Sequence, residues 1–335
     1  MTNLTPAVSA ETVVPSFADV LKAADRIKGQ AVRTPLLRSD ALDAITGARV
    51  FLKPECLQRT GSFKFRGAFN AISSLDPSVR AHGIVASSSG NHAQGVAEAA
   101  RILGTSATIV MPSDAPAIKR RKTEGYGASV VAYNRASDDR DAITAGIAAS
   151  TGATIVHPYE HPGVIAGQGT IGLELTDDLA ALGLTPDAVF VCCGGGGLTA
   201  GVALAVKERA PNAALYTVEP EGFDDQARSF LAGERQKNPT SSGSVCDALL
   251  APMPGVASFA INRSRVTRGL TVTDAEAMNA VAFAARELKL VVEPGGAVAL
   301  AALLQGRADI KGKVVVAVLS GGNIDPDVFA QALQA

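Results

Sequence analysis

The sequence predicts an α/β fold: two three-layer parallel-sheet domains with a cleft between them. Short apolar runs alternate with helical patterns from Gly83 onward. Such alternation implies right-handed crossovers between parallel strands. Three of the runs end on unusual turns, after Ala86, Cys192 and Leu319. Because ligands of open parallel sheets bind at the carboxyl ends of strands, we expect these turns to meet at one site in the cleft.

Length and composition support two domains and exclude some partners. The chain has 335 residues, 47% of them apolar, enough for two cores in domains of about 100–200 residues. The net charge of −1 argues against a nucleic acid or an anionic membrane as partner. No apolar stretch is long enough to span a membrane, and the N-terminus lacks the features of a secretory signal.

The cysteines indicate a reducing compartment. The chain has four cysteines: Cys56, Cys192, Cys193 and Cys246. No two of them form a C-x-x-C pair. We therefore expect no disulfide framework and a cytoplasmic location.

Apolar spacing predicts the elements in chain order. We expect a helix at residues 17–27 and a short strand at 49–52 before the Pro54 turn. Later strands are expected at 84–86, 107–111, 129–132, 154–156, 188–192, 214–218 and 314–319. Later helices are expected at 93–100, 118–124, 142–149, 171–181, from 198 onward, 275–288 and 297–304. We predict a mobile tail (1–15), a large domain (16–78 and 158–335) and a small domain (79–157).

One lysine has an unusual setting. Lys64 lies between Phe63 and Phe65, after a Gly-Ser turn. An apolar pocket would lower the pKa of its amine from about 10.4, and a neutral amine can form a Schiff base with a carbonyl compound. The alternative is a lysine that buries its stem and keeps its ammonium in water.

The turn after Cys192 contains four consecutive glycines, Gly194, Gly195, Gly196 and Gly197. Ordering each costs about 0.5–1 kcal/mol relative to alanine, so a compensating ligand is expected. Free N–H groups before a helix form a cradle for an anion such as phosphate. The alternatives are a flexible turn, or a weak dinucleotide fingerprint (G-x-G-x-x-A) with Glu219 as the ribose-binding acid.

The turns after Ala86 and Leu319 are also candidates. Ser88, Ser89, Asn91 and His92 open a helix, where hydroxyl and N–H groups can hold a carboxylate. An ordinary helix cap would use the same residue types. Ser320 with its two following glycines could equally form only a tight turn.

Six motifs in order resemble the pyridoxal-phosphate enzymes of fold type II, and among them the serine/threonine dehydratases and serine racemases. The motifs are G-S-F-K-F-R-G-A, S-S-G-N-H-A-Q-G, V-I-A-G-Q-G-T, G-G-G-G-L-T-A-G, V-E-P-G-G-A and L-S-G-G-N. Together they extend over nearly the whole chain, from about Phe17 to Asp325. The resemblance implies that the large domain binds pyridoxal phosphate.

The resemblance also implies residue roles. Lys64 would bind the cofactor as a Schiff base and later handle the substrate α-proton, while Phe63 packs on the ring. Asn91 would bond the ring hydroxyl, and Ser320 would face the ring nitrogen. The phosphate would be held by Gly194, Gly195, Gly196, Gly197 and Leu198, and the substrate carboxylate by Ser88, Ser89, Asn91 and His92.

Ser320 favours one kind of chemistry. An acid at the ring nitrogen would favour a protonated, strongly electron-withdrawing ring, whereas a neutral hydroxyl does not. A weaker electron sink suits loss of a β-hydroxyl as the α-proton leaves, which yields a 2-keto acid and ammonia. We therefore expect an ammonia-lyase (dehydratase) acting on a β-hydroxy-α-amino acid.

An acidic stretch resembles the divalent-metal site of the racemases and eukaryote-like dehydratases. Two carboxylates and a backbone carbonyl, from Glu219, Asp225 and Phe223, would bind Mg²⁺ or Mn²⁺. The alternative is a solvated acidic loop.

Three features bear on the substrate and disagree. Ser89 stands where many threonine dehydratases have alanine and racemases have a second acid/base. Residues 246–255 are more apolar than in the racemases, which suits threonine or phenylserine. Arg140 lies where the racemase has an arginine near a distal carboxylate, which suits 3-hydroxyaspartate.

Other functions stay open at this point. An amino-acid racemase would use Lys64 and Ser89, an NAD-type oxidoreductase would use Gly195, Gly197 and Glu219, and a non-catalytic binding module is the fourth alternative. The resemblance further implies a homodimer or homotetramer with a small amino acid as substrate. The chain ends ten residues after Asp325, so we expect a catabolic enzyme without a feedback-regulatory domain.

Overall fold

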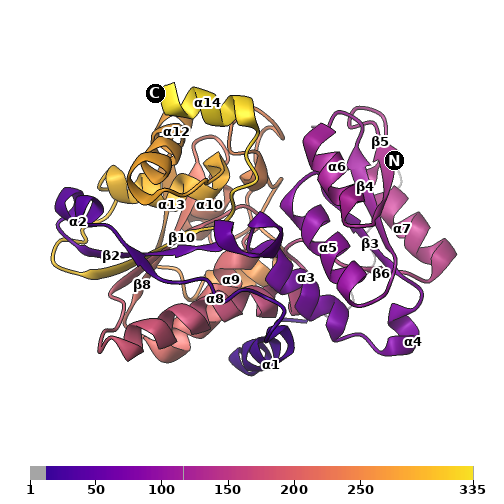
Figure 1. The fold of residues 1–335 in the computed structure, drawn as a ribbon, viewed down its shortest axis with the longest axis horizontal. Helices are drawn as coiled ribbons and strands as arrows, with labels where there is room; N and C mark the ends of the chain where they lie inside the picture. Colours follow the sequence, from indigo (N-terminus) through magenta and orange to yellow (C-terminus); the bar gives the residue numbers. More distant parts are fainter. Residues whose placement is uncertain (1–12, 116, 335) are drawn as a thin grey trace.

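The computed structural model describes residues 13–115 and 117–334, and it contains two β-sheets (Figure 1). The strands of the larger sheet, in spatial order, are β1 (Leu37–Arg38), β2 (Arg49–Pro54), β10 (Val314–Leu319), β7 (Ala188–Cys192), β8 (Ala214–Pro220) and β9 (Arg268–Val272). Those of the smaller sheet are β5 (Ser129–Tyr133), β4 (Ala107–Pro112), β3 (Ile84–Ser87) and β6 (Thr154–Ile155). The α/β class and the parallel sheets are confirmed. The predicted tail lies mostly outside the described residues, and the domain boundaries stay a prediction.

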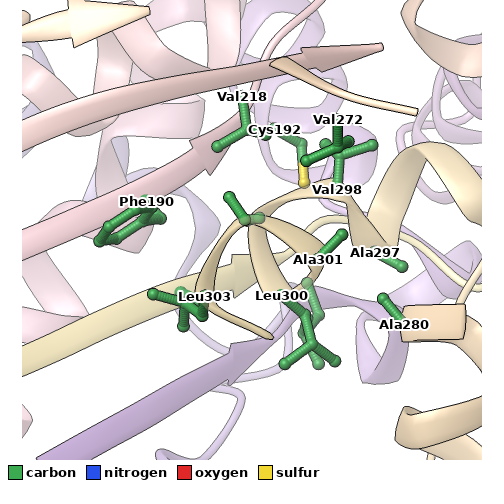
Figure 2. Packing of buried hydrophobic residues seen from close by; sticks show 14 of the residues in the cluster. Phe190, Cys192, Val218, Val272, Ala280, Ala297, Val298, Leu300, Ala301 and Leu303 are labelled. Atoms are coloured by element: carbon green, nitrogen blue, oxygen red, sulfur yellow. The ribbon is translucent and has the colours of Figure 1, made fainter. Parts of the chain in front are cut away.

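Helices cover both faces of the larger sheet. One face carries α2 (Asp40–Thr46), α12 (Asp274–Phe283), α13 (Pro294–Leu304) and α14 (Pro326–Gln334). Figure 2 shows the core on this side, where Leu300 and Leu303 of α13 pack near Phe190 of β7. The other face carries α1 (Phe17–Ile27), α8 (Pro162–Ala181), α9 (Gly197–Arg209) and α11 (Val256–Asn262). The helix α10 (Asp225–Ala232) packs on β8 and β9.

The smaller sheet also lies between helices. Its core is shared with α3 (Lys64–Ser73) and α5 (Asn91–Ile102) on one face and with α7 (Arg140–Thr151) on the other. The helices α4 (Pro77–Arg80) and α6 (Ala117–Gly125) and the short turns η1 (Glu55–Leu57), η2 (Arg59–Gly61), η3 (Asp247–Leu249) and η4 (Ala284–Leu288) complete the chain. In the described part of the chain, no helix has both the length and the apolar character needed to cross a bilayer.

The helix α3 joins the two sheets. It buries Phe65, Ala68 and Ile72 in the core of the smaller sheet. It also packs along α8, which covers the larger sheet. The helix α3, which begins at Lys64, therefore lies where the two halves of the molecule meet (Figure 1).

Three element predictions need correction. The helix predicted at residues 171–181 begins already at Pro162. Its first half is rich in glycine, which favours a loop, but here the glycines allow close packing between helices. A Cβ on Gly167 would lie only 2.6 Å from the Cα of Gly67 in α3, so that contact requires glycine. The helix predicted at 275–288 ends at Phe283 and continues as the π-helical turn η4. The larger sheet is not wholly parallel, since the edge strand β1 pairs antiparallel with β2.

Candidate active site

A cavity of 590 Å³ lies where the carboxyl ends of β3, β7 and β10 meet. Its lining includes the turns that follow these strands, as the sequence predicted. The lining contains every residue predicted to bind the cofactor or the substrate carboxylate: Phe63, Lys64, Ser88, Ser89, Asn91, His92, Gly194, Gly195, Gly196, Gly197, Leu198 and Ser320. Residues far apart in the sequence thus share one cavity, and the role of each within it stays a prediction.

The amine of Lys64 has few polar partners in this cavity. Its Nζ donates a hydrogen bond to the carbonyl oxygen of Pro158 at 3.0 Å and lies 5.1 Å from the ring centre of Phe63. Burial lowers the pKa of Lys64 to about 8, against an opposing attraction from Glu293. An amine with this pKa is largely neutral in mildly alkaline solution and can act as a nucleophile or a base.

A pair of backbone contacts fixes the start of α3 against the larger sheet. The N–H of Phe63 donates to the carbonyl oxygen of Ser320 at 3.0 Å, and Ser62 forms a bridge with Gly321. Ser320 itself is 4% exposed and follows β10 directly. The lysine and the hydroxyl predicted to face the ring nitrogen are therefore held in one rigid unit.

The glycine turn leads from β7 into α9. Gly196 has a φ of +89°, which a side chain would strain, and a Cβ on Gly195 would lie 2.4 Å from the ring of Tyr159. The first N–H groups of a helix have no partner within it, and here they belong to Gly197 and Leu198 at the cavity wall. Such N–H groups at the positive end of the helix dipole fit a phosphate.

The turn after β3 offers a second anion site at the start of α5. The hydroxyl of Ser88 accepts a hydrogen bond from the N–H of Gly90 at 3.2 Å. The ring of His92 is buried and donates through Nε2 to the carbonyl oxygen of Val156 at 2.8 Å. Burial lowers the pKa of His92 to about 3, so the ring is neutral and its Nδ1 can only accept. For an anion, His92 therefore offers its backbone N–H rather than its ring.

Residues without a predicted role also line the cavity. Glu293 accepts a hydrogen bond at Oε1 from Asn91 Nδ2 at 2.5 Å, and burial raises the pKa of Glu293 to about 7. Pro158 supplies the partner of Lys64, and Tyr159 packs against the glycine turn. One signal for Glu293 was available, since it is a lone carboxylate inside the apolar V-V-E-P-G-G-A segment.

The cavity also has a cationic side. Arg135 and Arg140 both line it, and each pairs with an aspartate through Nε. In the part of the chain that the structure describes, the other guanidinium N–H groups of both arginines have no partner and can bind a ligand. The Nε of Arg140 donates to Asp141 at 2.9 Å. Sequence reasoning found Arg140 and missed Arg135.

The predicted metal ligands lie outside this cavity lining. Glu219 ends β8 and Asp225 begins α10, and both side chains are buried. The Glu219 carboxylate accepts from the N–H groups of Gln226 and Ala227, each at 2.9 Å. Asp225 has one oxygen, Oδ2, that is buried without a hydrogen-bond partner among the described residues. Across the ranges that the structure covers, no group of three or more His, Cys, Asp or Glu side chains could hold a metal ion.

Burial and the repulsion between the two carboxylates both raise the pKa of Glu219, and burial raises the pKa of Asp225 to about 7. An orphaned carboxylate oxygen beside a second carboxylate suits a hard cation. The same geometry argues against the dinucleotide alternative, because the carboxylate of Glu219 points at the start of α10 and is not presented to a ribose.

Comparison with known proteins extends over nearly the whole chain. The family described as "Pyridoxal-phosphate dependent enzyme" matches residues 27–321. An L-threo-3-hydroxyaspartate ammonia-lyase from Pseudomonas sp is 47% identical over 95% of this chain and 98% of its own length. A serine racemase from Schizosaccharomyces pombe is 42% identical over 97% of this chain and 99% of its own.

A solved structure has the same fold. The crystal structure of maize serine racemase superposes with a TM-score of 0.89 and 34% sequence identity. The match covers 96% of this chain and 98% of that one. The relatives therefore share a fold while their names give different activities.

Proposed function

The chain belongs to the pyridoxal-phosphate-dependent enzyme family, and from this membership and the cavity we propose that its preferred substrate is 3-hydroxyaspartate. The enzyme is a dehydratase of the ammonia-lyase type, in line with the names of its relatives. It would convert a β-hydroxy-α-amino acid into a 2-keto acid and ammonia. This assignment replaces the oxidoreductase and binding-module alternatives.

The substrate proposal rests on the position of Arg140 in the cavity lining. A 3-hydroxyaspartate molecule has a second carboxylate, which threonine and serine lack. Arg140 borders the cavity with N–H groups free, and arginine binds carboxylates through paired hydrogen bonds. The apolar segment that suggested threonine or phenylserine contributes Leu249 and Pro252 to the lining, but Ser241 and Ser244 lie beside them. That wall is therefore mixed rather than apolar.

The chain's own residues supply binding and proton transfer. The start of α5, with Ser88 and Ser89, would hold the α-carboxylate, and the start of α9 would hold the cofactor phosphate. When bound, pyridoxal phosphate supplies an electron-accepting ring that stabilises negative charge at the substrate α-carbon. Lys64, whose amine donates a hydrogen bond to the Pro158 carbonyl, would take the α-proton. Loss of the β-hydroxyl as water leaves an enamine, which becomes an imine and is hydrolysed to the keto acid and ammonia.

Substrate preference tests the proposal. Release of keto acid from L-threo-3-hydroxyaspartate, L-threonine and L-serine is measured for the wild type, Arg140→Met and Arg140→Lys. We expect Arg140→Met to lower kcat/KM for 3-hydroxyaspartate about 100-fold, because a charged hydrogen-bonded pair is lost, while kcat/KM for serine changes less than about threefold. Arg263→Met, at an exposed arginine outside the cavity, is the matched control. A wild type that prefers serine or threonine over 3-hydroxyaspartate would refute the substrate proposal.

Racemisation is a second candidate activity, favoured by Ser89. Ser89 shares the cavity with Lys64, and the serine racemase relative matches almost the whole chain. We expect Ser89→Ala to lower racemisation of L-serine more than elimination, measured by chiral chromatography alongside keto-acid release. Equal loss of both activities would contradict a separate role for Ser89.

A divalent cation at Glu219, Asp225 and the Phe223 carbonyl is part of the proposal. The orphaned Oδ2 of Asp225 supports it. We expect a chelator to lower the thermal midpoint, and Mg²⁺ or Mn²⁺ to restore it, because a cation relieves the repulsion between the carboxylates. A midpoint indifferent to chelator would remove the metal from the proposal.

Assembly and location are likewise proposed. We infer a homodimer or homotetramer from the family, to be measured by analytical ultracentrifugation of the purified chain. The four cysteines are free in the structure, which is compatible with a cytoplasmic location.

A further inference from the structure

We propose that Glu293 and Asn323 are positioning residues that hold the Asn91 amide in one orientation, with an N–H free for the ring oxygen of the cofactor. The proposal rests on the function given above, in which Asn91 contacts that oxygen. Glu293 lies in the motif V-E-P-G-G-A and Asn323 in L-S-G-G-N, and the sequence analysis assigned no role to either side chain. The structure brings them to either side of Asn91.

The orientation of the Asn323 amide is fixed from both ends. Lys122 Nζ, on α6, donates to Asn323 Oδ1 at 3.1 Å. Asn323 Nδ2 donates to the carbonyl oxygen of Thr60 at 2.8 Å. An ammonium can only donate and a carbonyl can only accept, so the oxygen and nitrogen of this amide cannot exchange places.

The strained backbone of Thr60 supports this arrangement. Thr60 has a φ of +64°, which is rare for a β-branched residue, and this conformation accompanies the contact of its carbonyl with Asn323. Strained residues of this kind concentrate at functional sites. Gly61 also lies close to this amide, since a Cβ on Gly61 would lie 3.0 Å from Asn323 Oδ1. A side chain at position 61 would therefore press on the Asn323 amide.

Asn323 in turn fixes the orientation of the Asn91 amide. The same Nδ2 of Asn323 donates to Asn91 Oδ1 at 2.8 Å, and Asn91 Nδ2 donates to Glu293 Oε1 at 2.5 Å. A Cβ on Gly321 would lie 2.4 Å from that Glu293 oxygen, so this position of the carboxylate requires glycine at 321. Among the described residues only Glu293 accepts from Asn91 Nδ2, and this nitrogen carries two hydrogens. Because Asn91 lines the cavity, the second N–H is the donor that the proposal assigns to the ring oxygen.

The orientation of the Asn91 amide decides whether a hydrogen-bond donor or an acceptor faces the cofactor ring oxygen. A donor next to the ring oxygen stabilises the oxygen as an anion, whereas an acceptor there would favour the neutral hydroxyl. The two forms of a lysine-bound pyridoxal cofactor absorb differently, the anion in the visible and the neutral hydroxyl form in the near ultraviolet. The absorption spectrum of the substrate-free holoenzyme therefore reports which way the Asn91 amide is oriented.

Asn323→Asp tests the network in the holoenzyme. An aspartate has the same shape but cannot donate, so it would face the Asn91 oxygen with an acceptor and turn the amide. We expect the visible band to fall, the near-ultraviolet band to rise, and the dissociation constant of the cofactor to increase about tenfold, the effect of one hydrogen bond. Both are measured by absorption titration of the apoprotein with pyridoxal phosphate. Asn134→Asp, in an exposed turn, is the matched control for the added charge.

A second pair of variants keeps the test decisive if Asn323→Asp does not fold, as judged by circular dichroism. Glu293→Gln keeps an oxygen acceptor for Asn91 and should retain the visible band, whereas Glu293→Ala should lose part of it. Wild-type spectra for the folded Asn323→Asp or Glu293→Ala variant would overturn the proposal. A wild type that binds no pyridoxal phosphate would instead refute the proposed function, so the two failures are distinguishable.

Discussion

Lys64 and Arg66 lie two residues apart on α3 and have opposite electrostatic surroundings. Lys64 borders the cavity, and within residues 13–115 and 117–334 its amine has one hydrogen bond, to the neutral carbonyl of Pro158. Burial therefore lowers the pKa of Lys64 to about 8. Arg66 is 0% exposed and bonds to the carboxylates of Glu55 and Glu174. Burial alone would lower the pKa of Arg66, but these carboxylates outweigh it and raise the pKa.

The Arg66 network links separate parts of the larger half of the molecule. Its guanidinium contacts Glu55 in η1, Glu174 in α8 and the carbonyl oxygen of Val32. Lys53, also 0% exposed, joins it through a 2.7 Å bond to Glu174. Each charged group of this cluster has an opposite partner, and the cluster holds α3 in place. Burial nevertheless lowers the pKa of Lys53.

The comparison shows how one helix can carry both a reactive and a structural cation. For Arg66 the paired carboxylates outweigh burial and raise the pKa, whereas for Lys64 burial dominates and lowers the pKa. The attraction of Glu293 opposes the effect of burial on the pKa of Lys64 but does not outweigh it. We expect substitutions at Lys64 to change chemistry, and substitutions at Arg66 to change stability.

The largest effect is expected for Lys64→Ala. Turnover should fall by at least about 10³-fold, because the group that takes the α-proton and binds the cofactor is lost. Keto-acid release and the absorption spectrum of the purified protein are the measurements. Retention of colour and turnover would show that another residue binds the cofactor.

Arg66→Met tests the other side of the comparison. It leaves the buried Glu55 without its partner, so the free energy of unfolding should fall by about 3–5 kcal/mol in urea denaturation. Lys64→Met, at the cavity wall, is the matched control and should change it by less than about 1 kcal/mol. Equal stability of the two variants would contradict a structural role specific to Arg66.

The smallest effect concerns pH. Only the neutral amine attacks an aldehyde, and with a pKa of about 8 its fraction rises as pH increases through that value. The rate at which apoprotein binds pyridoxal phosphate should rise about tenfold between about pH 7 and pH 9 and then level off. Stopped-flow absorbance measures this rate. A rate still climbing tenfold per pH unit at pH 9 would show an unperturbed lysine.

Local patterns in the sequence were sufficient to predict much of this site. Phenylalanines beside Lys64, a costly glycine run and a serine-rich helix start are each visible over a few residues. Alternating apolar runs predicted that these turns meet at one site in the cleft, because ligands of open parallel sheets bind at the carboxyl ends of strands. The start of α8 was not predicted correctly. Gly167 allows α3 to pack closely against α8, and no local sequence pattern reveals that contact.

By itself, then, the sequence determined the α/β architecture and the residue types of the cavity, because periodicity and turn chemistry act over short distances. Only the tertiary structure decided that, among the described residues, Lys64 bonds to a neutral carbonyl while Arg66 bonds to two carboxylates. It alone also placed Glu293 and Asn323 on either side of Asn91. Most of these contacts join groups about a hundred or more residues apart, and a pKa is set by whichever charges the fold brings within a few ångströms.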